Sequence, residues 1–315
     1  MNNQPEVVCV GIGGIDITAS TVRGDVFDRM VSFVDSITTC AGGDALNEAM
    51  TLGKLGHAVS YMGCSGHDAM GMLMKLCGEK CGVDMSSVRL LEDINTQTVI
   101  SLVGENDKRN FLFKKDCATN HMDLSCIDWD KLQHAKVLSF GSLSSSNGFD
   151  GKQLEKLFRF AKEHGAIVCV DVAIAGEEKD LVENIASAFP YVDYIFPNAE
   201  EAAALSGEKA PDRIADFFLK LGVKNVVMKL GGDGCFVKGE AGQYQLPAFR
   251  VKAVNTTGAG DNFLAGFISG LLQGLSMRER LLFATATAAL TVMCEGASDG
   301  VKNMQQVRAF LEEHS

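Results

Sequence analysis

Several signals that mark common protein classes are missing from the sequence. The two Gly-Lys pairs, at 53–54 and 151–152, are followed by Leu and Gln, so no Gly-x-x-x-x-Gly-Lys-Ser/Thr motif exists and a P-loop enzyme is excluded. The apolar stretch LLFATATAALTVMC (281–294) is interrupted by threonines and is shorter than the roughly 20 residues that a membrane span needs. The N-terminus MNNQPEVVCV lacks the basic region and long apolar core of a signal peptide. We therefore expect a cytoplasmic protein with no membrane partner.

Positive charge is also scarce. The chain has 29 Lys and Arg against 40 Asp and Glu, which gives a formal net charge of −11. Nucleic acids and acidic membranes bind to cationic faces, so this balance argues against both as partners. Small anionic ligands are not excluded, because a local nest of backbone N–H groups binds phosphate within an acidic protein.

Cysteine and histidine occur without the spacing of a metal site. The ten cysteines form no Cys-x-x-Cys pair, the closest being Cys77 and Cys81, and the six histidines show no ligand pattern. Cys9 and Cys169 lie within apolar runs, VVCVG and IVCVD. We expect reduced, buried thiols in a cytosolic protein.

What the sequence does contain is a regular alternation of strand-like and helix-like segments. Short β-branched runs, which are typical of buried parallel strands, occupy residues 7–13, 136–140, 166–172, 193–197 and 225–230. Amphipathic segments lie between them at 151–165 and 211–222, and the second begins with Pro and ends with Gly as helices do. This order predicts a doubly wound α/β fold, with a mostly parallel sheet covered by helices on both faces.

Two half-polar regions interrupt the alternation. Residues from about 17 to 40 and from 96 to 115 alternate polar and apolar side chains, and GENDKRN (104–110) is a strong hairpin-turn signal. Both regions are too polar for the centre of a parallel sheet. We expect residues 1–315 to form one domain, with these two insertions building a small antiparallel sheet that acts as a lid.

GIGG (11–14) is the first glycine-rich segment, and it follows the opening strand. A dinucleotide-binding motif needs a complete Gly-x-Gly-x-x-Gly that opens a helix, whereas the chain continues here with the β-like IDITASTV. We favour a glycine-rich strand end that lets a ligand approach Asp16.

The segment CAGGDALNEAMTLGKLG (40–56) places Gly42 and Gly43 before a predicted helix. Asp44, Asn47 and Glu48 would lie in its first turn, where acids favour the positive end of the helix dipole. Alternatively, the two glycines expose backbone N–H groups while Asn47 hydrogen-bonds a polyol. The residues alone leave both interpretations open.

NTTGAGDNF (255–263) is the strongest candidate for an anion site. Consecutive backbone N–H groups at the start of an apolar helix meet the positive end of the helix dipole, a combination that favours phosphate. Asp261 lies in the first turn, within reach of whatever the N–H groups hold. A helix cap would not require two glycines around an alanine, so we favour a phosphate cradle with a built-in acid.

These segments together resemble the ribokinase-like carbohydrate kinases, the phosphofructokinase B (PfkB) family. The positions that fall at the spacing of its first signature are Gly42, Gly43, Asn47, Ala49, Gly56 and Gly66, and NTTGAGDNF matches its second. Three further segments resemble family motifs: PNAEEAAALSG (197–207), KLGGDGCFV (229–237) and EGAS (295–298). The resemblance covers essentially the whole chain, including the inserted strands.

The resemblance implies transfer of the γ-phosphoryl group of ATP to a sugar hydroxyl, with Mg²⁺. It makes Asp261 the base and assigns the backbone N–H groups of Gly258, Ala259 and Gly260 to the transferring phosphoryl group. It assigns the sugar hydroxyls to Asp16, Gly42, Gly43 and Asn47. It assigns the nucleotide to Lys229, Gly231, Gly234 and Thr257, and Mg²⁺, held through water, to Asn198 and Glu201.

Three positions depart from the family pattern. Asn255 replaces an Asp that helps many members to bind a monovalent cation, which weakens the case for potassium activation. Thr285 stands where some members have an adenine-side Asn, so nucleotide preference stays open. Asp44 follows the diglycine, where Lys or a small residue is frequent, and it disfavours an anionic sugar. Lys114 and Lys115 could offset that charge, but we favour solvated positions for both.

The leading hypothesis is therefore an ATP-dependent sugar kinase. A nucleoside kinase of the same fold and a catalytically silent sugar-binding regulator are the alternatives. The scarcity of aromatic residues in the lid argues against the first, and an intact base argues against the second. Apolar lid residues (Val31, Phe33, Val99 and Ile100) also predict a homodimer formed through the lid.

Overall fold

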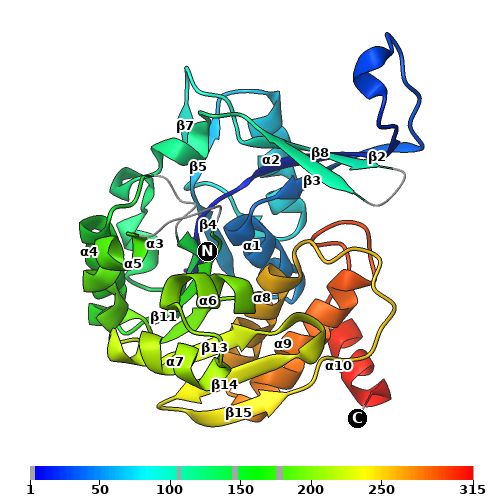
Figure 1. The fold of residues 1–315 in the computed structure, drawn as a ribbon. Coiled ribbons are helices and arrows are strands. Elements are labelled where there is room, and N and C mark those ends of the chain that lie inside the picture. The colour runs from blue at the N-terminus through cyan, green and yellow to red at the C-terminus, as the bar shows by residue number, and fades with distance from the viewer. Residues whose placement is uncertain (1–3, 105–107, 144–147, 175–179, 315) are drawn as a thin grey trace.

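The computed structural model describes residues 4–104, 108–143, 148–174 and 180–314, and within them a nine-stranded sheet forms the centre of the molecule (Figure 1). Its order is β15-β14-β13-β12-β11-β10-β1-β4-β6. The strands are β1 (Val7–Gly11), β4 (Val59–Met62), β6 (Val83–Asp84), β10 (Val137–Leu143), β11 (Ile167–Val172), β12 (Tyr194–Phe196), β13 (Asn225–Lys229), β14 (Cys235–Gly239) and β15 (Gly242–Leu246). All neighbours are parallel except β13–β14 and β14–β15, so the expected doubly wound, mostly parallel sheet is confirmed.

Helices cover both faces of this sheet. They are α1 (Asp44–Lys54), α2 (Ala69–Lys80), α3 (Trp129–Leu132), α4 (Gly151–Glu163), α5 (Leu181–Ile185), α6 (Ala199–Ser206), α7 (Pro211–Lys220), α8 (Ala259–Leu272), α9 (Met277–Val292) and α10 (Met304–Glu313). Successive strand residues point to opposite faces, which explains why the five β-branched runs are apolar without alternation. On one face β1 contributes Val8 and Val10 to a core shared with α4 and α7, and on the other Val7 and Cys9 pack with α1, α8 and α9.

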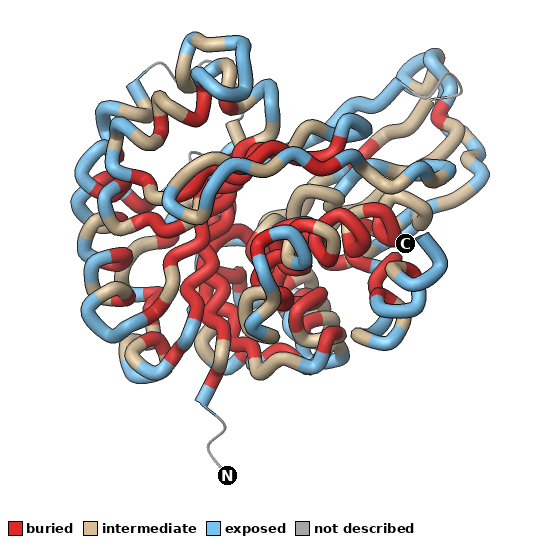
Figure 2. Tube along the Cα trace, turned by 90° about the horizontal axis from the view of Figure 1, so that it is seen from below, coloured by how far each residue is buried: buried red, intermediate tan, exposed pale blue. Residues whose placement is uncertain are grey.

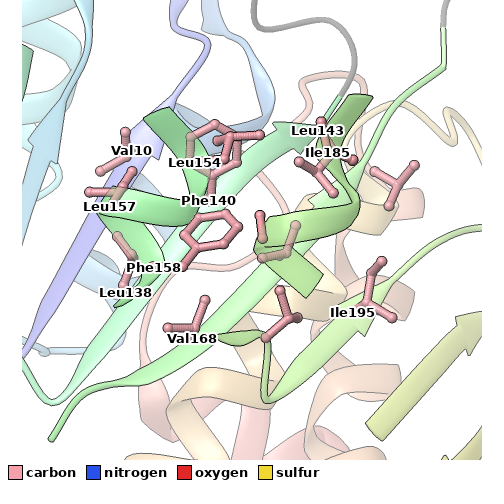
Figure 3. Packing of buried hydrophobic residues seen from close by; sticks show 14 of the residues in the cluster. Val10, Leu138, Phe140, Leu143, Leu154, Leu157, Phe158, Val168, Ile185 and Ile195 are labelled. Carbon is pink, nitrogen blue, oxygen red and sulfur yellow. The ribbon is translucent and has the colours of Figure 1, made fainter. Parts of the chain in front are cut away.

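The core beneath α4 illustrates this packing (Figure 3). Phe140 of β10 meets Phe158 of α4 edge to face, with ring centroids 5.5 Å apart. Leu154 and Leu157 of the same helix are also buried, at the i, i+3, i+4 spacing expected of an amphipathic helix. Figure 2 shows that the buried residues follow the sheet and the inner sides of the helices.

A separate small sheet projects from the main body (Figure 1). Its order is β3 (Ser36–Gly42), β2 (Gly14–Val22), β8 (Thr98–Gly104) and β9 (Arg109–Phe113). β2–β3 and β8–β9 are antiparallel hairpins, but β2 and β8 pair in parallel. The expectation of an antiparallel sheet was therefore wrong for the central pair, because β2 and β8 both run outward from the body. Residues 105–107 of the predicted turn lie outside the described residues.

The ten cysteines all lie in the described part of the chain, and none forms a disulfide. Six of them are buried, in agreement with the expected role as small apolar core residues. None of the described helices combines the length and the apolar character that crossing a bilayer requires.

Candidate active site

Helix α8 begins at a glycine that no other residue could replace without strain. Gly258 has φ of +77°, and a Cβ there would collide with the carbonyl oxygen of Ala297. The first i to i−4 bond of the helix runs from Asn262 N to Gly258 O (3.0 Å), so the preceding amides have no acceptor in the helix. Ala259 N donates to Thr256 O at 3.2 Å and is engaged in the turn. The amides of Gly258 and Gly260 remain the better candidates for an anion.

Helix α1 also begins at a left-handed glycine. Gly43 has φ of +94°, and a Cβ there would lie 2.7 Å from Ile12 O. A Cβ on Gly42 would collide with the carboxylate of Asp16 in β2. The diglycine thus lets the strand end and this carboxylate approach each other closely. Burial raises the pKa of Asp16 to about 6.

Two side-chain bonds join α1 to α8. Asn47 Nδ2 donates to Asp261 Oδ2 at 2.8 Å, and one turn later Thr51 Oγ1 donates to Asn262 Oδ1 at 2.5 Å. Asn47 is only 3% exposed, and its Oδ1 finds no hydrogen-bond partner among the described residues. The amide group that the sequence linked to a sugar therefore gives its N–H to Asp261 and orients that carboxylate.

The electrostatic surroundings leave Asp261 able to accept a proton. Burial, followed by the nearby Asp171 carboxylate, raises the pKa of Asp261 to about 6, while Asn47 and Lys229 act in the opposite direction. A carboxylate with this pKa is mostly ionised at pH 7 yet more basic than a solvated aspartate. Asp261 thus has the properties of a general base.

A cavity of about 530 Å³ opens at the start of α8. The predicted site residues that line it are Asn198, Glu201, Lys229, Gly231, Gly234, Ala259, Gly260 and Asp261. Much of its remaining wall is apolar and comes from α8, α9 and the loop between β15 and α8: Ala248, Phe249, Val251, Ala253, Phe263, Ala288, Ala289 and Val292, with Thr285 among them. The cavity thus has a charged end at Asp261 and an apolar end that suits a planar ring.

Lys229 supplies a cation at the charged end. Its Nζ lies 2.6 Å from Oδ1 of Asp171 and close enough to α8 that a Cβ on Gly260 would be 3.0 Å away. Burial lowers the pKa of Lys229, but Asp171, Glu201 and Asp261 outweigh it and hold the pKa above its ordinary value. The Lys229 ammonium therefore stays charged beside residues 255–260, the glycine loop.

Sequence reasoning missed Asp171, which is 2% exposed at the end of β11. The segment IVCVDV was interpreted only as a buried strand. Its single acid was a usable signal, because ligands bind at the carboxyl ends of parallel strands and a buried carboxylate there requires a partner.

Asn198 and Glu201 form a capping box at the start of α6. Glu201 N donates to Asn198 Oδ1 at 2.9 Å, and Asn198 N donates to Glu201 Oε2 at 2.8 Å. Burial raises the pKa of Glu201 to about 7. These bonds explain both residues structurally, but both also face the cavity with hard oxygen atoms, which are the donors that Mg²⁺ prefers. Among the described residues no cluster of three or more His, Cys, Asp or Glu could hold a metal by itself.

Two further acids, both on α1, lie near Asp261. Asp44 lines the cavity and accepts a hydrogen bond from Ser142 Oγ, and burial together with Asp261 raises its pKa well above the ordinary value. Glu48 is fully buried and accepts from Ser139 Oγ at 2.5 Å, and burial raises its pKa strongly. Asp44 thus lines the cavity, whereas Glu48 is buried against β10 through its bond with Ser139.

The loop before α8 is held by Asn255. Its Oδ1 accepts from Thr257 N (3.0 Å) and from Arg109 Nη1 of β9 (2.9 Å), and its Nδ2 donates to Glu295 O at 2.6 Å. Thr257, predicted on the nucleotide side, is exposed and also contacts Arg109, whereas Thr256 lines the cavity. The contact with Arg109 has no signal in the sequence, because it joins residues 146 positions apart.

One face of the small sheet carries Asp16 and two aromatic residues. Asp16 pairs with Val99 and Val99 with Phe113, so all three lie on the same face. Phe111, two residues before Phe113 in β9, lies on the same face, and the two ring centroids are 6.3 Å apart. Phe111 is 51% and Phe113 65% exposed. Opposite them, Ile15 and Ile17 pack into the core with α2.

Comparison with known proteins gives a consistent result. The sequence model described as pfkB family carbohydrate kinase matches residues 4–304. The chain is 29% identical to the 2-dehydro-3-deoxygluconokinase of Bacillus subtilis over 286 residues, which are 88% of each chain. It is 31% identical to the ATP-dependent ribose-1-phosphate kinase of Halopiger xanaduensis over 307 residues, which are 98% of each.

Among solved structures, the ribokinase of Thermotoga maritima superimposes with a TM-score of 0.82 at 28% identity. The match covers 98% of this chain and 99% of that one, so the similarity extends over the main body and the small sheet.

Proposed function

Since the chain belongs to the pfkB family of carbohydrate kinases, phosphotransferases with an alcohol acceptor, we propose that it transfers the γ-phosphoryl group of ATP to a sugar hydroxyl with Asp261 as the base. The observation that carries the proposal is the Asp261 carboxylate at the start of α8, oriented by Asn47 and facing the same cavity as Lys229. A silent sugar-binding regulator has no use for a base in this position.

In the proposed reaction Asp261 accepts the hydroxyl proton as the acceptor oxygen bonds to the γ-phosphorus and the bond to the β-phosphate oxygen breaks. Negative charge on the transferring group would be stabilised by the amides of Gly258 and Gly260 and by Lys229, with Ala259 contributing once its turn bond opens. Such preorganised donors provide most of what phosphoryl transfer requires. The apolar end of the cavity would hold the adenine ring, with Gly231 and Gly234 beside it.

We propose that the reaction uses Mg²⁺, because Asn198 and Glu201 bring oxygen-bearing side chains to the cavity. Asn198 and Glu201 would hold it through water while phosphate oxygens supply the remaining ligands, since Mg²⁺ keeps several waters and takes few protein carboxylates. The ion would offset charge on the nucleotide. The capping bonds of both residues keep their oxygen atoms in place for this role.

The acceptor would bind between the small sheet and the start of α1. Asp16 can accept from two hydroxyls, and the absence of a side chain at Gly42 lets this carboxylate lie close to the start of α1. Asp44, Asp171 and Asp261 make this end of the site acidic, and only Lys229 opposes them among the residues that line the cavity. An uncharged polyol therefore fits better than a phosphorylated sugar, although one relative is a ribose-1-phosphate kinase.

A nucleoside acceptor is the second candidate. The lid has few aromatic residues, which argued against it in the sequence, but two of them lie on the face that carries Asp16 and favour it. Phe111 and Phe113 share a sheet face with Asp16, so a base attached to the sugar could stack on them.

We propose that the small sheet is the lid of a single domain and that the face carrying Asp16 covers the acceptor.

We propose that catalysis does not depend on potassium. Asn255 has no negative charge, and its Oδ1 already accepts two hydrogen bonds. Its Nδ2 donates to the Glu295 carbonyl oxygen. Replacing KCl by choline chloride should leave kcat within about twofold, and strong activation by K⁺ would contradict this.

The tip of the small sheet supports a homodimer. Phe27, Met30 and Phe33 are more than 89% exposed there, at 93%, 101% and 90%, with Val31 and Ile37 also exposed. Such a surface is more apolar than a monomer normally leaves in water. Light scattering should report a dimer at micromolar concentration and a monomer for Phe33→Asp, and a monomeric parent protein would rule the dimer out.

A cytoplasmic location is also proposed. Ten unpaired thiols are typical of a reducing compartment.

The central experiment is a substrate panel. Protein, ATP and Mg²⁺ are incubated with aldoses, ketoses, 2-dehydro-3-deoxygluconate, ribose 1-phosphate and nucleosides, and ADP release is measured. We expect turnover on an uncharged sugar or a nucleoside, and none with Asp261→Asn. Sugar binding by calorimetry without turnover on any acceptor would instead identify a silent regulator.

A further inference from the structure

Arg109 joins the small sheet to the glycine loop. Its Nη1 donates to Asn255 Oδ1 at 2.9 Å and reaches Thr257 Oγ1 at 3.4 Å. In the sheet register Arg109 pairs with Val103 and Val103 with Ser20, four residues along β2 from Asp16. Arg109 therefore lies on the same sheet face as Asp16, the face proposed to cover the acceptor.

Asn255, the partner of Arg109, is a junction of three segments. Its Oδ1 fixes the amide of Thr257, the residue before Gly258, and its Nδ2 holds the Glu295 carbonyl in the segment after α9. The bonded Thr257 amide directly precedes Gly258, whose backbone is left-handed, so Asn255 holds the chain where it enters the turn. Whatever holds Asn255 in place also sets the direction of the amides at the start of α8.

We propose that Arg109 is a positioning residue for phosphoryl transfer, which fixes the glycine loop through Asn255 and thereby couples the small sheet to the anion site. A hydrogen bond from a guanidinium to an amide oxygen is stronger than a neutral one, so it restrains the loop effectively. The guanidinium also brings positive charge to the rim of a site that contains several carboxylates. This inference rests on the proposed kinase function.

The Arg109 contact would link acceptor binding to the positioning of the glycine loop. An acceptor bound against Asp16 would hold the same sheet face that carries Arg109, so the glycine loop would be set when the acceptor is in place. Arg109 should consequently affect the rate of transfer more than the binding of ATP.

Three variants test the proposal by kinetics: Arg109→Ala, Arg109→Lys and, as a matched control, Lys108→Ala. Lys108 is an exposed cation next to Arg109 in the chain. We expect Arg109→Ala to lower kcat about tenfold, in line with loss of a charged hydrogen bond, with KM for ATP within about twofold. Arg109→Lys should recover part of the loss, because lysine keeps the charge without the planar fork, and Lys108→Ala should stay within about twofold. An unchanged kcat, or a rise only in the acceptor KM, would overturn the positioning role.

A double-mutant cycle with Asn255→Ala tests the route through Asn255. If Arg109 acts through this residue, the double variant should be no slower than Asn255→Ala alone. Multiplicative losses would show independent roles and overturn the proposal.

Hydrogen exchange gives a readout that does not need turnover. The Thr257 and Gly258 amides should exchange several-fold faster in Arg109→Ala than in Lys108→Ala, with equal melting temperatures. Unchanged exchange would refute the restraint itself. Faster exchange in a protein that phosphorylates no acceptor would refute the proposed function while leaving the restraint intact.

Discussion

Helices α1 and α8 begin in nearly the same way. Each starts after a glycine with positive φ, Gly43 at +94° and Gly258 at +77°, and each has an acid in its first turn. The sequence favours a phosphate cradle at the start of α8, whereas at the start of α1 it leaves a dipole-stabilised helix start and a polyol site equally open. The two helices even lie side by side, joined by the Asn47–Asp261 and Thr51–Asn262 bonds.

The difference lies in position and partner. Asp44 is the first residue of α1 and accepts from a serine hydroxyl, whereas Asp261 is the third residue of α8 and accepts from an amide of the other helix. Lys229 lies against the start of α8. Burial raises the pKa of both acids; at Asp44 the Asp261 carboxylate adds to the rise, whereas at Asp261 the Asn47 amide opposes it. Surroundings, rather than the local pattern, thus decide which acid is suited to act as the base.

The largest expected effect tests this assignment directly. Asp261→Asn removes the proton acceptor and should lower kcat by about 10³-fold with little change in KM for ATP. Asp44→Asn, the matched change on α1, should cost less than about tenfold. Steady-state kinetics on the acceptor found in the panel measures both. If the α1 variant loses as much as the α8 variant, the distinction between the two acids fails.

A smaller effect should follow from removing the Asn47–Asp261 hydrogen bond between α1 and α8. Asp261 works as a base only when ionised, so kcat should fall as the pH drops through about 6. Asn47 donates to the carboxylate and favours its ionised form, so Asn47→Ala should raise the pKa and move this acid limb to higher pH. A pH–kcat profile measures the shift.

Thr51→Val is the control for that experiment. It removes the second bond between α1 and α8 without touching Asp261, so it should lower the melting temperature and leave the acid limb in place. A limb that moves equally in both variants would mean that helix packing, rather than Asn47, sets the pKa.

The smallest effect concerns acceptor choice. Asp44→Asn removes one carboxylate from the charged end of the cavity and should improve kcat/KM for a phosphorylated sugar several-fold relative to an uncharged one. Competition between two such acceptors measures the ratio. An unchanged ratio would contradict the proposal that Asp44 disfavours an anionic acceptor.

The sequence was sufficient where a local pattern has a single physical solution. The five buried strands follow from uninterrupted β-branched runs, and the glycine loop before Asp261 follows from the needs of a helix start. The roles given to the site residues stay predictions, but Lys229, Glu201 and Asp261 do face one cavity.

Relations between distant segments were beyond such reasoning. The parallel pairing of β2 with β8 depends on where two insertions leave the body, and the Arg109–Asn255 contact depends on that pairing. The acid at the end of the IVCVDV strand was a usable signal for Asp171, but its pairing with Lys229, 58 positions away, had no signal in the sequence. Burial, which shifts the pKa of Asp16 and Glu201, is likewise a property of the folded chain.

The two bonds between α1 and α8 have a consequence for how such an enzyme can diverge. They fasten α1 to α8 through Asn47 and Thr51, in the first and second turns of α1, while Asp44 at its tip takes no part in them. Selection could therefore exchange the residue at position 44, and with it the charge presented to an acceptor, without moving Asp261. A helix anchored along its length and variable at its tip separates the evolution of specificity from the conservation of chemistry.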